Sequence, residues 1–381
     1  MRKPLPAMII AFIVGLALGT IVLQFVTLGI ELIWGKLPTA WADDRAWYLF
    51  GVLLLGALGT WAVRRYIGDN GHAPLAGLGA PPLSPKQYVN VILAILATLF
   101  GGFVLGPEVA LISTGSLVGY VTAKSMKFDD DASMKKIAGI GSLGGILALF
   151  VLPLISGSMS LGTAKDIHYQ DLFWAIGVAL VVTVIVTLAR VLAAIIARYT
   201  GPKPHLPIML LAALVVGGSA MALHWITGDS VLLVVTSGEE FIPELTKLTS
   251  ISTVILVMLF KSLAYSVSLG GGFRGGPFFP AMFVGGAAGL LTSLIFPSGP
   301  SVMAATAVGV IASIIATAKM KWGVVILIGA ALGFIFGSWL LIPAGVIGAI
   351  VARAVPRWGD RIVTDLDHPA MNTATVPHTG T

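Results

Sequence analysis

Cysteine is absent from this chain, and charge is scarce. Charged residues make up 10% of the 381 residues, whereas a soluble globular protein carries about 25%. Without cysteine there can be no disulfide framework, no thiolate nucleophile and no zinc–thiolate centre. The net charge of 23 − 17 = +6 is small and scattered along the sequence, which excludes nucleic acid as a partner.

Signatures of catalysis are also missing. The chain has no GxSxG and no H-E-x-x-H motif, and its apolar stretches contain no paired acids of the kind an intramembrane aspartyl protease needs. The six histidines do not cluster, so a metal site has no support. We therefore predict a protein that is not an enzyme and that holds neither a metal nor a cofactor.

What the chain has in abundance is apolar sequence, at 57% of its residues. At roughly 20 residues per crossing, this composition allows about ten or eleven membrane spans at most. The apolar stretches differ in length: Ala7–Trp34 and Trp322–Val351 exceed one simple crossing, whereas Val109–Ala123 and Val302–Ala318 fall short of one. The sequence predicts an all-α polytopic membrane protein with tilted, broken and re-entrant helices.

Basic residues mark the loops that the positive-inside tendency places in the cytoplasm. These are Arg64/Arg65, Lys124/Lys127, Lys135/Lys136, Lys203, Lys319/Lys321 and Arg353/Arg357/Arg361. We expect a multi-pass protein of the plasma (cytoplasmic) membrane with both termini in the cytoplasm. Residues 1–363 form the expected membrane domain, and the polar residues 364–381 are expected to be a disordered tail.

An internal repeat is the most informative feature of the sequence. Gly101–Gly119 (GGFVLGPEVALISTGSLVG) aligns with Gly271–Gly289 (GGFRGGPFFPAMFVGGAAG) at an offset of 271 − 101 = 170 residues. The paired positions include a Phe and a Pro besides glycines, and Gly139 and Gly309 continue the offset. We predict duplicated halves at about 46–200 and 206–355. Matching Gly/Pro-interrupted segments point to a transporter-type site where the two halves meet.

Glu108 is the sharpest candidate residue. It is the only charged side chain between Lys86 and Lys124, and a lone carboxylate in an apolar stretch is costly unless it has a function. The alternative to a functional role is that Glu108 lies at the membrane surface or caps a helix. Gly106-Pro107 predicts a helix start, which places Glu108 in the first turn beside free backbone N–H groups. Such an N-terminus binds anions, so an ionised Glu108 can occupy an anion site and a protonated one can leave it.

The second copy contains the same helix start without the acid. Gly276-Pro277 precedes Phe278 and Phe279, which either line an anion site or only pack. Arg274 is absent from the first copy, and it either attracts anions or sits at the interface. Lys261 lies inside an apolar run, where it either faces a water-filled vestibule or extends to a lipid headgroup.

At these residues the chain resembles the chloride channel (CLC) family of anion channels and proton-coupled antiporters. The family carries a GSGIP-type loop, then G-[KR]-E-G-P, then a GGxFxP segment. Their order and spacing match this chain over roughly residues 45–350, at Asn70–Pro74, at Gly106 with Glu108, and at Lys261, Gly275, Gly276, Phe278, Pro280, Gly285 and Gly289.

The resemblance implies an all-helical homodimer with inverted repeats and a separate pore in each subunit, embedded in the lipid bilayer. It makes Glu108 the external gating glutamate. The anion ligands would be backbone groups at Gly106, Val109, Gly276, Phe278 and Phe279, together with the loop at Gly71. The transported species would be chloride or another small inorganic anion.

Several positions depart from the family pattern. Gly71 replaces the loop serine that touches the central anion, and Pro277 has no N–H to donate. The second, inward-facing glutamate of proton-coupled members would fall near Gly162 or Thr163, where this chain has no acid. We therefore expect passive, channel-like anion movement gated by Glu108. The alternatives are a proton-coupled chloride antiporter with Asp166 or His72 as relay, and a polytopic membrane protein without transport activity.

Overall fold

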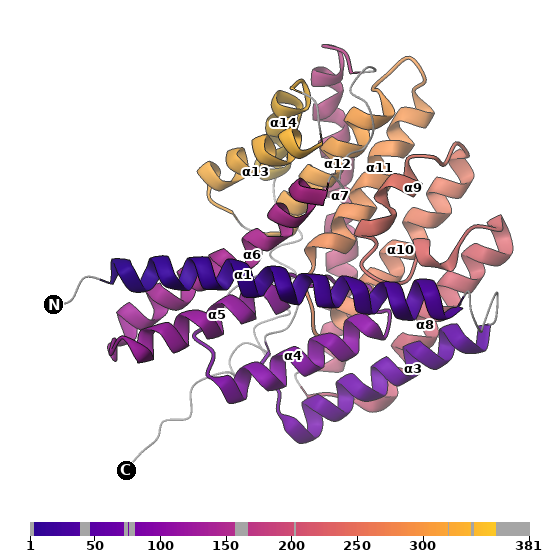
Figure 1. Cartoon of the computed structure of the whole chain (residues 1–381). Helices are drawn as coiled ribbons and strands as arrows, with labels where there is room; N and C mark the ends of the chain where they lie inside the picture. Colours follow the sequence, from indigo (N-terminus) through magenta and orange to yellow (C-terminus); the bar gives the residue numbers. More distant parts are fainter. Residues whose placement is uncertain are drawn as a thin grey trace.

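The structure is a computed structural model that describes residues 4–38, 46–71, 75, 81–156, 167–201, 203–318, 320–336 and 339–355, with the backbone alone at 151–156 and 239. Helices follow one another through all of these segments (Figure 1). In chain order they are α1 (Leu5–Ile30), η1 (Glu31–Lys36), α3 (Ala46–Ala62), η2 (Val63–Ile67), α4 (Pro85–Phe100), α5 (Glu108–Ser125), α6 (Asp131–Ser156), α7 (Asp171–Thr200), α8 (Leu206–Thr227), η5 (Val231–Leu233), η6 (Glu239–Phe241), α9 (Ile242–Leu245), α10 (Ile251–Gly270), α11 (Phe278–Ile295), α12 (Val302–Thr317), α13 (Trp322–Ile335) and α14 (Leu341–Ala354).

The prediction of an all-α polytopic protein is confirmed. Seven helical segments are long and apolar enough to cross a membrane, and four shorter apolar helices accompany them: α4, α12, α13 and α14. In the described part of the chain the only extended pairing is a two-residue contact between Gly106 and Gly276. The predicted tail at 364–381 lies outside the described residues.

The two long apolar stretches form different structures. Ala7–Trp34 lies within one helix, because α1 continues directly into the π-helical turn η1. Trp322–Val351 instead contains two short helices, α13 and α14, that pack against each other. The backbones of Gly329 and Gly345 lie in contact across this pair. The second stretch is therefore a broken segment, as its length predicted.

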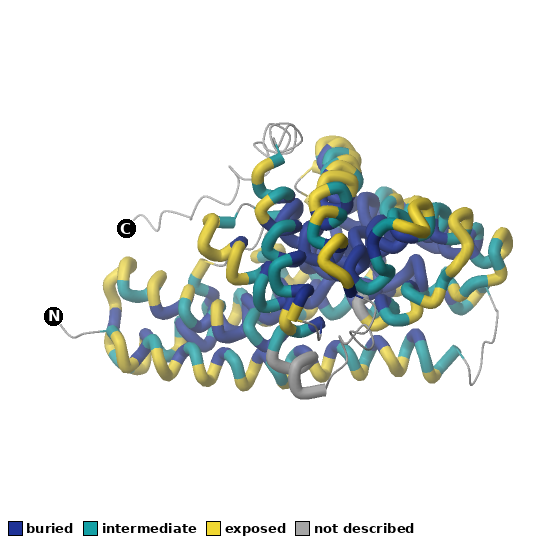
Figure 2. The backbone as a smooth tube through the Cα atoms, turned by 90° about the horizontal axis from the view of Figure 1, so that it is seen from above, coloured by how far each residue is buried: buried dark blue, intermediate teal, exposed yellow. Residues whose placement is uncertain are grey.

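Glycine also allows α1 to approach α6 closely. A Cβ added to Gly15 would lie 2.6 Å from the carbonyl oxygen of Gly141, and one added to Gly19 would lie 2.8 Å from that of Gly145. In Figure 1, α1 runs alongside α5 and α6. Exposed positions recur along this long helix in Figure 2. Many of the exposed residues of α1, such as Ile9, are large and apolar, which suits contact with lipid.

The two copies of the repeat contact each other reciprocally. The backbone N–H of Val104 donates to the Ser268 hydroxyl at 3.0 Å, and the N–H of Arg274 donates to the Thr98 hydroxyl at 3.3 Å. Both donors and both acceptors are 170 residues apart, since 274 − 104 = 268 − 98 = 170. A pair of contacts that exchanges roles in this way is the mark of a local two-fold axis between the copies.

The same axis relates the loops that precede α5 and α11. The rings of Phe103 and Phe273 stack with centroids 3.7 Å apart. Gly102 and Gly272 have φ angles of +81° and +92°, a left-handed conformation that glycine adopts at little cost. The paired Phe and glycine positions of the sequence repeat therefore form corresponding parts of one interface.

One pairing within the repeat was wrong. The offset of 170 matched Gly139 with Gly309, but a Cβ on Gly139 would meet nothing within 4 Å. Gly309 packs against the backbone of Gly285, and the residue that packs in this way against Gly115 is Gly141. The offset changes to 309 − 141 = 168 residues, since Gly115 and Gly141 are 141 − 115 = 26 residues apart whereas Gly285 and Gly309 are 309 − 285 = 24 residues apart.

Candidate functional site

Two helix starts from the two halves of the chain meet inside the molecule. α5 begins at Glu108 after Pro107, and α11 begins at Phe278 after Pro277. The loops before them are joined by two hydrogen bonds: Gly106 N–H donates to the Gly276 carbonyl at 2.7 Å, and Gly276 N–H donates to the Gly106 carbonyl at 2.6 Å. The first N–H groups of a helix lack helical partners and carry the positive end of its dipole. The arrangement therefore concentrates backbone donors around one buried point.

Glu108 occupies this point. Its side chain is fully buried, and its Oε1 accepts a hydrogen bond of 2.7 Å from the backbone N–H of Phe279. Glu108 lies in the first turn of α5, as predicted. Its carboxylate, however, reaches across and caps α11 of the other half, a contact that the sequence did not reveal. A carboxylate here occupies a position at which a free anion would meet the same donor.

The backbone around the carboxylate leaves no space for a side chain. A Cβ added to Gly106 or to Gly276 would overlap the carboxyl group of Glu108. These two glycines are paired in the sequence repeat, and both are buried. They fit the backbone against the carboxylate from both halves.

Phe278 and Phe279, at the start of α11, are both buried, with 7% and 5% of their surface exposed. Phe279 belongs to the main hydrophobic cluster, and Phe278 does not. Val109, the next residue after Glu108, is buried in the first turn of α5. These residues thus surround the predicted site, and the ring of Phe279 also packs in the core.

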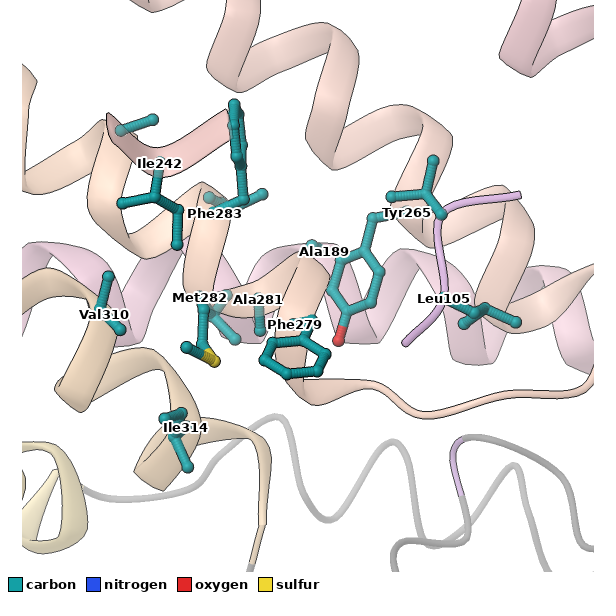
Figure 3. Packing of buried hydrophobic residues seen from close by; sticks show 14 of the residues in the cluster. Leu105, Ala189, Ile242, Tyr265, Phe279, Ala281, Met282, Phe283, Val310 and Ile314 are labelled. Atoms are coloured by element: carbon teal, nitrogen blue, oxygen red, sulfur yellow. The ribbon is translucent and has the colours of Figure 1, made fainter. Parts of the chain in front are cut away.

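Tyr265 contributes a contact that the sequence analysis missed. This fully buried side chain on α10 donates a hydrogen bond of 2.7 Å from its hydroxyl to the carbonyl of Pro277, the residue just before α11. Figure 3 shows the hydroxyl beside the ring of Phe279. The bond holds the start of α11 in place. The available signal was a lone tyrosine in the apolar α10, four residues after Lys261.

Neither predicted environment of Lys261 is correct. The side chain is fully buried and extends to neither a headgroup nor a vestibule. Its ammonium donates to the carbonyls of Val235 and Thr236 at 3.0 and 2.9 Å and lies 4.8 Å from the ring centre of Phe283. Carbonyl acceptors and an aromatic face replace water around a buried ammonium. Lys261 therefore fixes the segment after η5 against α10 and α11.

Arg274 is also buried. Its guanidinium Nη2 lies 2.6 Å from Asp69 Oδ1, in an ion pair that joins the two halves. Asp69 pairs on its other side with Arg64. Gly71, two residues after Asp69, lies close to Arg274, since a Cβ there would be 3.3 Å from the Arg274 Cδ. The structure thus places Gly71 beside Arg274. The position at which the family pattern has an anion-contacting serine therefore lies next to a guanidinium in this protein.

Other predicted positions lie outside the described residues. These are His72, Asp166 and the Gly162–Thr163 position at which the family pattern has an inward-facing acid. Among the described residues no group of three or more potential metal ligands occurs.

Comparison with known proteins identifies the family. The family model described as voltage gated chloride channel matches residues 155–357, which is more than half of the chain. The chain belongs to the voltage-gated chloride channel family. It is therefore a multi-span membrane protein of a family that transports chloride and other anions.

Curated relatives and solved structures agree with this membership. The chain is 24% identical over 344 residues to proteins named "Putative ion-transport protein YfeO" from Escherichia coli and Shigella flexneri, covering 78% of this chain and 80% of theirs. Its fold is similar to that of a slow cyanobacterial Cl⁻/H⁺ antiporter, with a TM-score of 0.75, 16% identity, and coverage of 99% of this chain and 100% of the other. A CLC-type fluoride/proton antiporter gives a TM-score of 0.66 at 13% identity, with coverage of 93% and 94%.

Proposed function

We propose that this member of the family conducts a small inorganic anion, most simply chloride, passively through the site between α5 and α11, with Glu108 as the gate. The observation that carries the proposal is the hydrogen bond from Phe279 N–H to Glu108 Oε1 at 2.7 Å. An ionised Glu108 blocks the site by satisfying this donor. When the carboxylate is protonated or swings away, the donor becomes available to an anion.

The proposed ligands are the backbone groups that surround this position. Gly106, Val109, Gly276, Phe278 and Phe279 lie at the two helix starts and are buried. Backbone groups with few charged neighbours would bind an anion weakly and reversibly, as conduction requires. Gly71 provides backbone next to Arg274, and we propose that it borders the anion's path.

The second candidate function is proton-coupled exchange of chloride. Two solved proteins with a similar fold are named as a Cl⁻/H⁺ and a fluoride/proton antiporter. Exchange would need a proton relay besides Glu108, for which Asp166 and His72 are the candidates. The lack of an acid near Gly162 and Thr163, where the family pattern has one, favours passive conduction.

The assembly and orientation follow the family. We propose a homodimer in the plasma membrane with one site in each subunit and with both termini in the cytoplasm. We also propose halves at 46–200 and 206–355, which the reciprocal contacts of Thr98 and Ser268 support.

Anion flux from proteoliposomes with simultaneous recording of internal pH tests the function. We expect wild-type protein to release chloride without coupled proton movement. Glu108→Gln and Glu108→Ala should abolish pH- or voltage-dependent gating while conduction survives. The rate at neutral pH should rise about tenfold or more, because a charge-assisted hydrogen bond of about 1.5–3 kcal/mol no longer has to break.

Glu244→Gln is the matched control, because Glu244 is half exposed on α9, where it pairs with Lys247 at the surface. It should behave like wild type. Chloride-driven proton uptake by the wild type would establish the antiporter instead. Unchanged gating in both Glu108 variants would remove Glu108 from the mechanism, and absence of flux would leave a protein without transport activity.

A further inference from the structure

Asp69 holds two arginines from distant parts of the chain. Arg64, at the end of the α3–η2 span, donates to Asp69 through Nε at 3.0 Å and through Nη2 at 2.6 Å. Arg274, in the loop before α11, donates to Asp69 Oδ1 through Nε at 3.2 Å and through Nη2 at 2.6 Å. One carboxylate is thus shared between two guanidiniums, and it connects the first half of the chain to the second.

Burial is unequal within this group. The side chain of Arg64 is 2% exposed and that of Arg274 is 10% exposed, whereas that of Asp69 is 26% exposed. Two guanidiniums are therefore largely withdrawn from water beside a carboxylate that both of them contact. The carboxylate is the member of the group that faces solvent.

The group lies next to the proposed anion site. Arg274 is two residues before Gly276, whose backbone contacts the Glu108 carboxylate. Arg64 Nη1 also donates to the carbonyl of Gly272 in the same loop. An anion bound at these guanidiniums would be held only a few residues from the start of α11.

We propose that Arg64 and Arg274 form a second anion-binding site, in which Asp69 takes the place of a small inorganic anion and exchanges with chloride from solution. Guanidinium forks bind carboxylates and inorganic anions through the same N–H groups. Asp69 lies in the loop between Ile67 and Gly71, so its displacement requires no movement of a helix. The device parallels Glu108, where a tethered carboxylate also occupies an anion position. The role of this site in loading the pathway rests on the proposed function, but anion binding itself does not.

A structural latch is the alternative explanation, because the same contacts tie the two halves together. The two explanations predict opposite results when Asp69 is neutralised. In a latch, loss of Asp69 weakens the protein in any salt. In an exchange site, loss of Asp69 frees the guanidiniums for chloride, so chloride restores what the carboxylate supplied.

Thermal unfolding in detergent separates them. Wild type, Asp69→Asn and the double variant Asp69→Asn/Arg274→Gln are unfolded in increasing sodium chloride, with sodium gluconate holding the ionic strength constant. We expect Asp69→Asn to be stabilised by chloride at concentrations about tenfold lower than wild type, since its internal competitor is gone. The double variant should lose this added dependence. Equal destabilisation of Asp69→Asn in both salts, or chloride dependence that survives in the double variant, overturns the proposal.

Two further measurements keep the result interpretable. The series is repeated with Glu108→Gln present, so that chloride bound between α5 and α11 is common to all samples and failure of the gate does not affect the outcome. If Asp69→Asn cannot be purified, Arg274→Gln is compared with wild type in chloride flux. Its apparent chloride affinity should fall by about tenfold, and an unchanged affinity overturns the proposal.

Discussion

Glu108 shows how the position of one side chain depends on both halves of the chain. Its isolation between Lys86 and Lys124 identified it in the sequence, because an unneeded carboxylate would be costly in an apolar stretch. Its partner, the N–H of Phe279, is 171 residues away and belongs to another helix. Sequence reasoning gave the residue its local helix start, whereas the donor on α11 required the fold.

Gly276→Ala tests this geometry without removing the acid. The added methyl group would overlap the Glu108 carboxyl group, so we expect the carboxylate to leave Phe279 N–H. Chloride flux at neutral pH should then rise toward that of Glu108→Gln, by about tenfold if one charged hydrogen bond is lost.

Gly286→Ala, on α11, is the control for Gly276→Ala. Its methyl group would meet Thr306 and Val310 at 3.4 Å, which is ordinary contact. Flux should remain at the wild-type value. A Gly276→Ala protein that folds and retains wild-type gating would show that the carboxylate does not need its observed position.

At the scale of the elements, the repeat could be inferred from the sequence because a Phe and a Pro matched along with the glycines. The contacts between its two copies could not be inferred in this way. Thr98 and Ser268 occupy equivalent positions, yet neither belongs to the aligned motif, and each caps the loop of the opposite copy. The false pairing of Gly139 with Gly309 has a related cause: a constant offset in the sequence does not show which glycine packs against Gly115 and which against Gly285.

The local two-fold axis leads to a prediction about membrane sidedness. α5 and α11 start at the same point, and if the axis lies in the membrane plane, their C-terminal ends reach opposite surfaces. The charges agree, because Lys124 and Lys127 lie at the end of α5 whereas 296–301, after α11, contain no charge.

Because the chain has no cysteine, single Ser→Cys variants can report this directly. Ser125 and Ser298 are both exposed, at the ends of the two helices. In intact cells a membrane-impermeant thiol reagent should label Ser298→Cys at least about tenfold faster than Ser125→Cys, and permeabilisation should equalise them. Equal labelling in intact cells would contradict the inverted arrangement.

At the scale of the whole molecule, the ion group at Asp69 joins the halves and links their stability to pH. Burial acts to raise the pKa of Asp69, but hydrogen bonds and charge from Arg64 and Arg274 outweigh it, and the pKa lies below its ordinary value of 3.8. A carboxyl with a lowered folded-state pKa stabilises the fold above its unfolded-state pKa and loses that contribution as pH falls through the folded-state value.

We therefore expect the unfolding temperature of the wild type to fall more steeply than that of Asp69→Asn below about pH 4. The measurement is made in gluconate, so that chloride cannot replace the carboxylate. Between pH 5 and 7 this residue should add no pH dependence to either protein. Parallel curves below pH 4 would show that the ion group does not contribute to stability.

The sequence by itself determined that this protein lies in a lipid bilayer, that it is helical, where the two helix starts lie, and which acid is the candidate. Hydropathy, helix-breaking Gly-Pro pairs and the cost of isolated charge are local properties, so they are visible in a short window of residues. Only the tertiary structure decided which donor Glu108 meets, that Lys261 is enclosed by carbonyls, that Tyr265 holds α11, and that Arg64 and Arg274 share Asp69. Each of these contacts joins atoms of different elements that only the folded chain brings together, so no pattern within one helix reveals them.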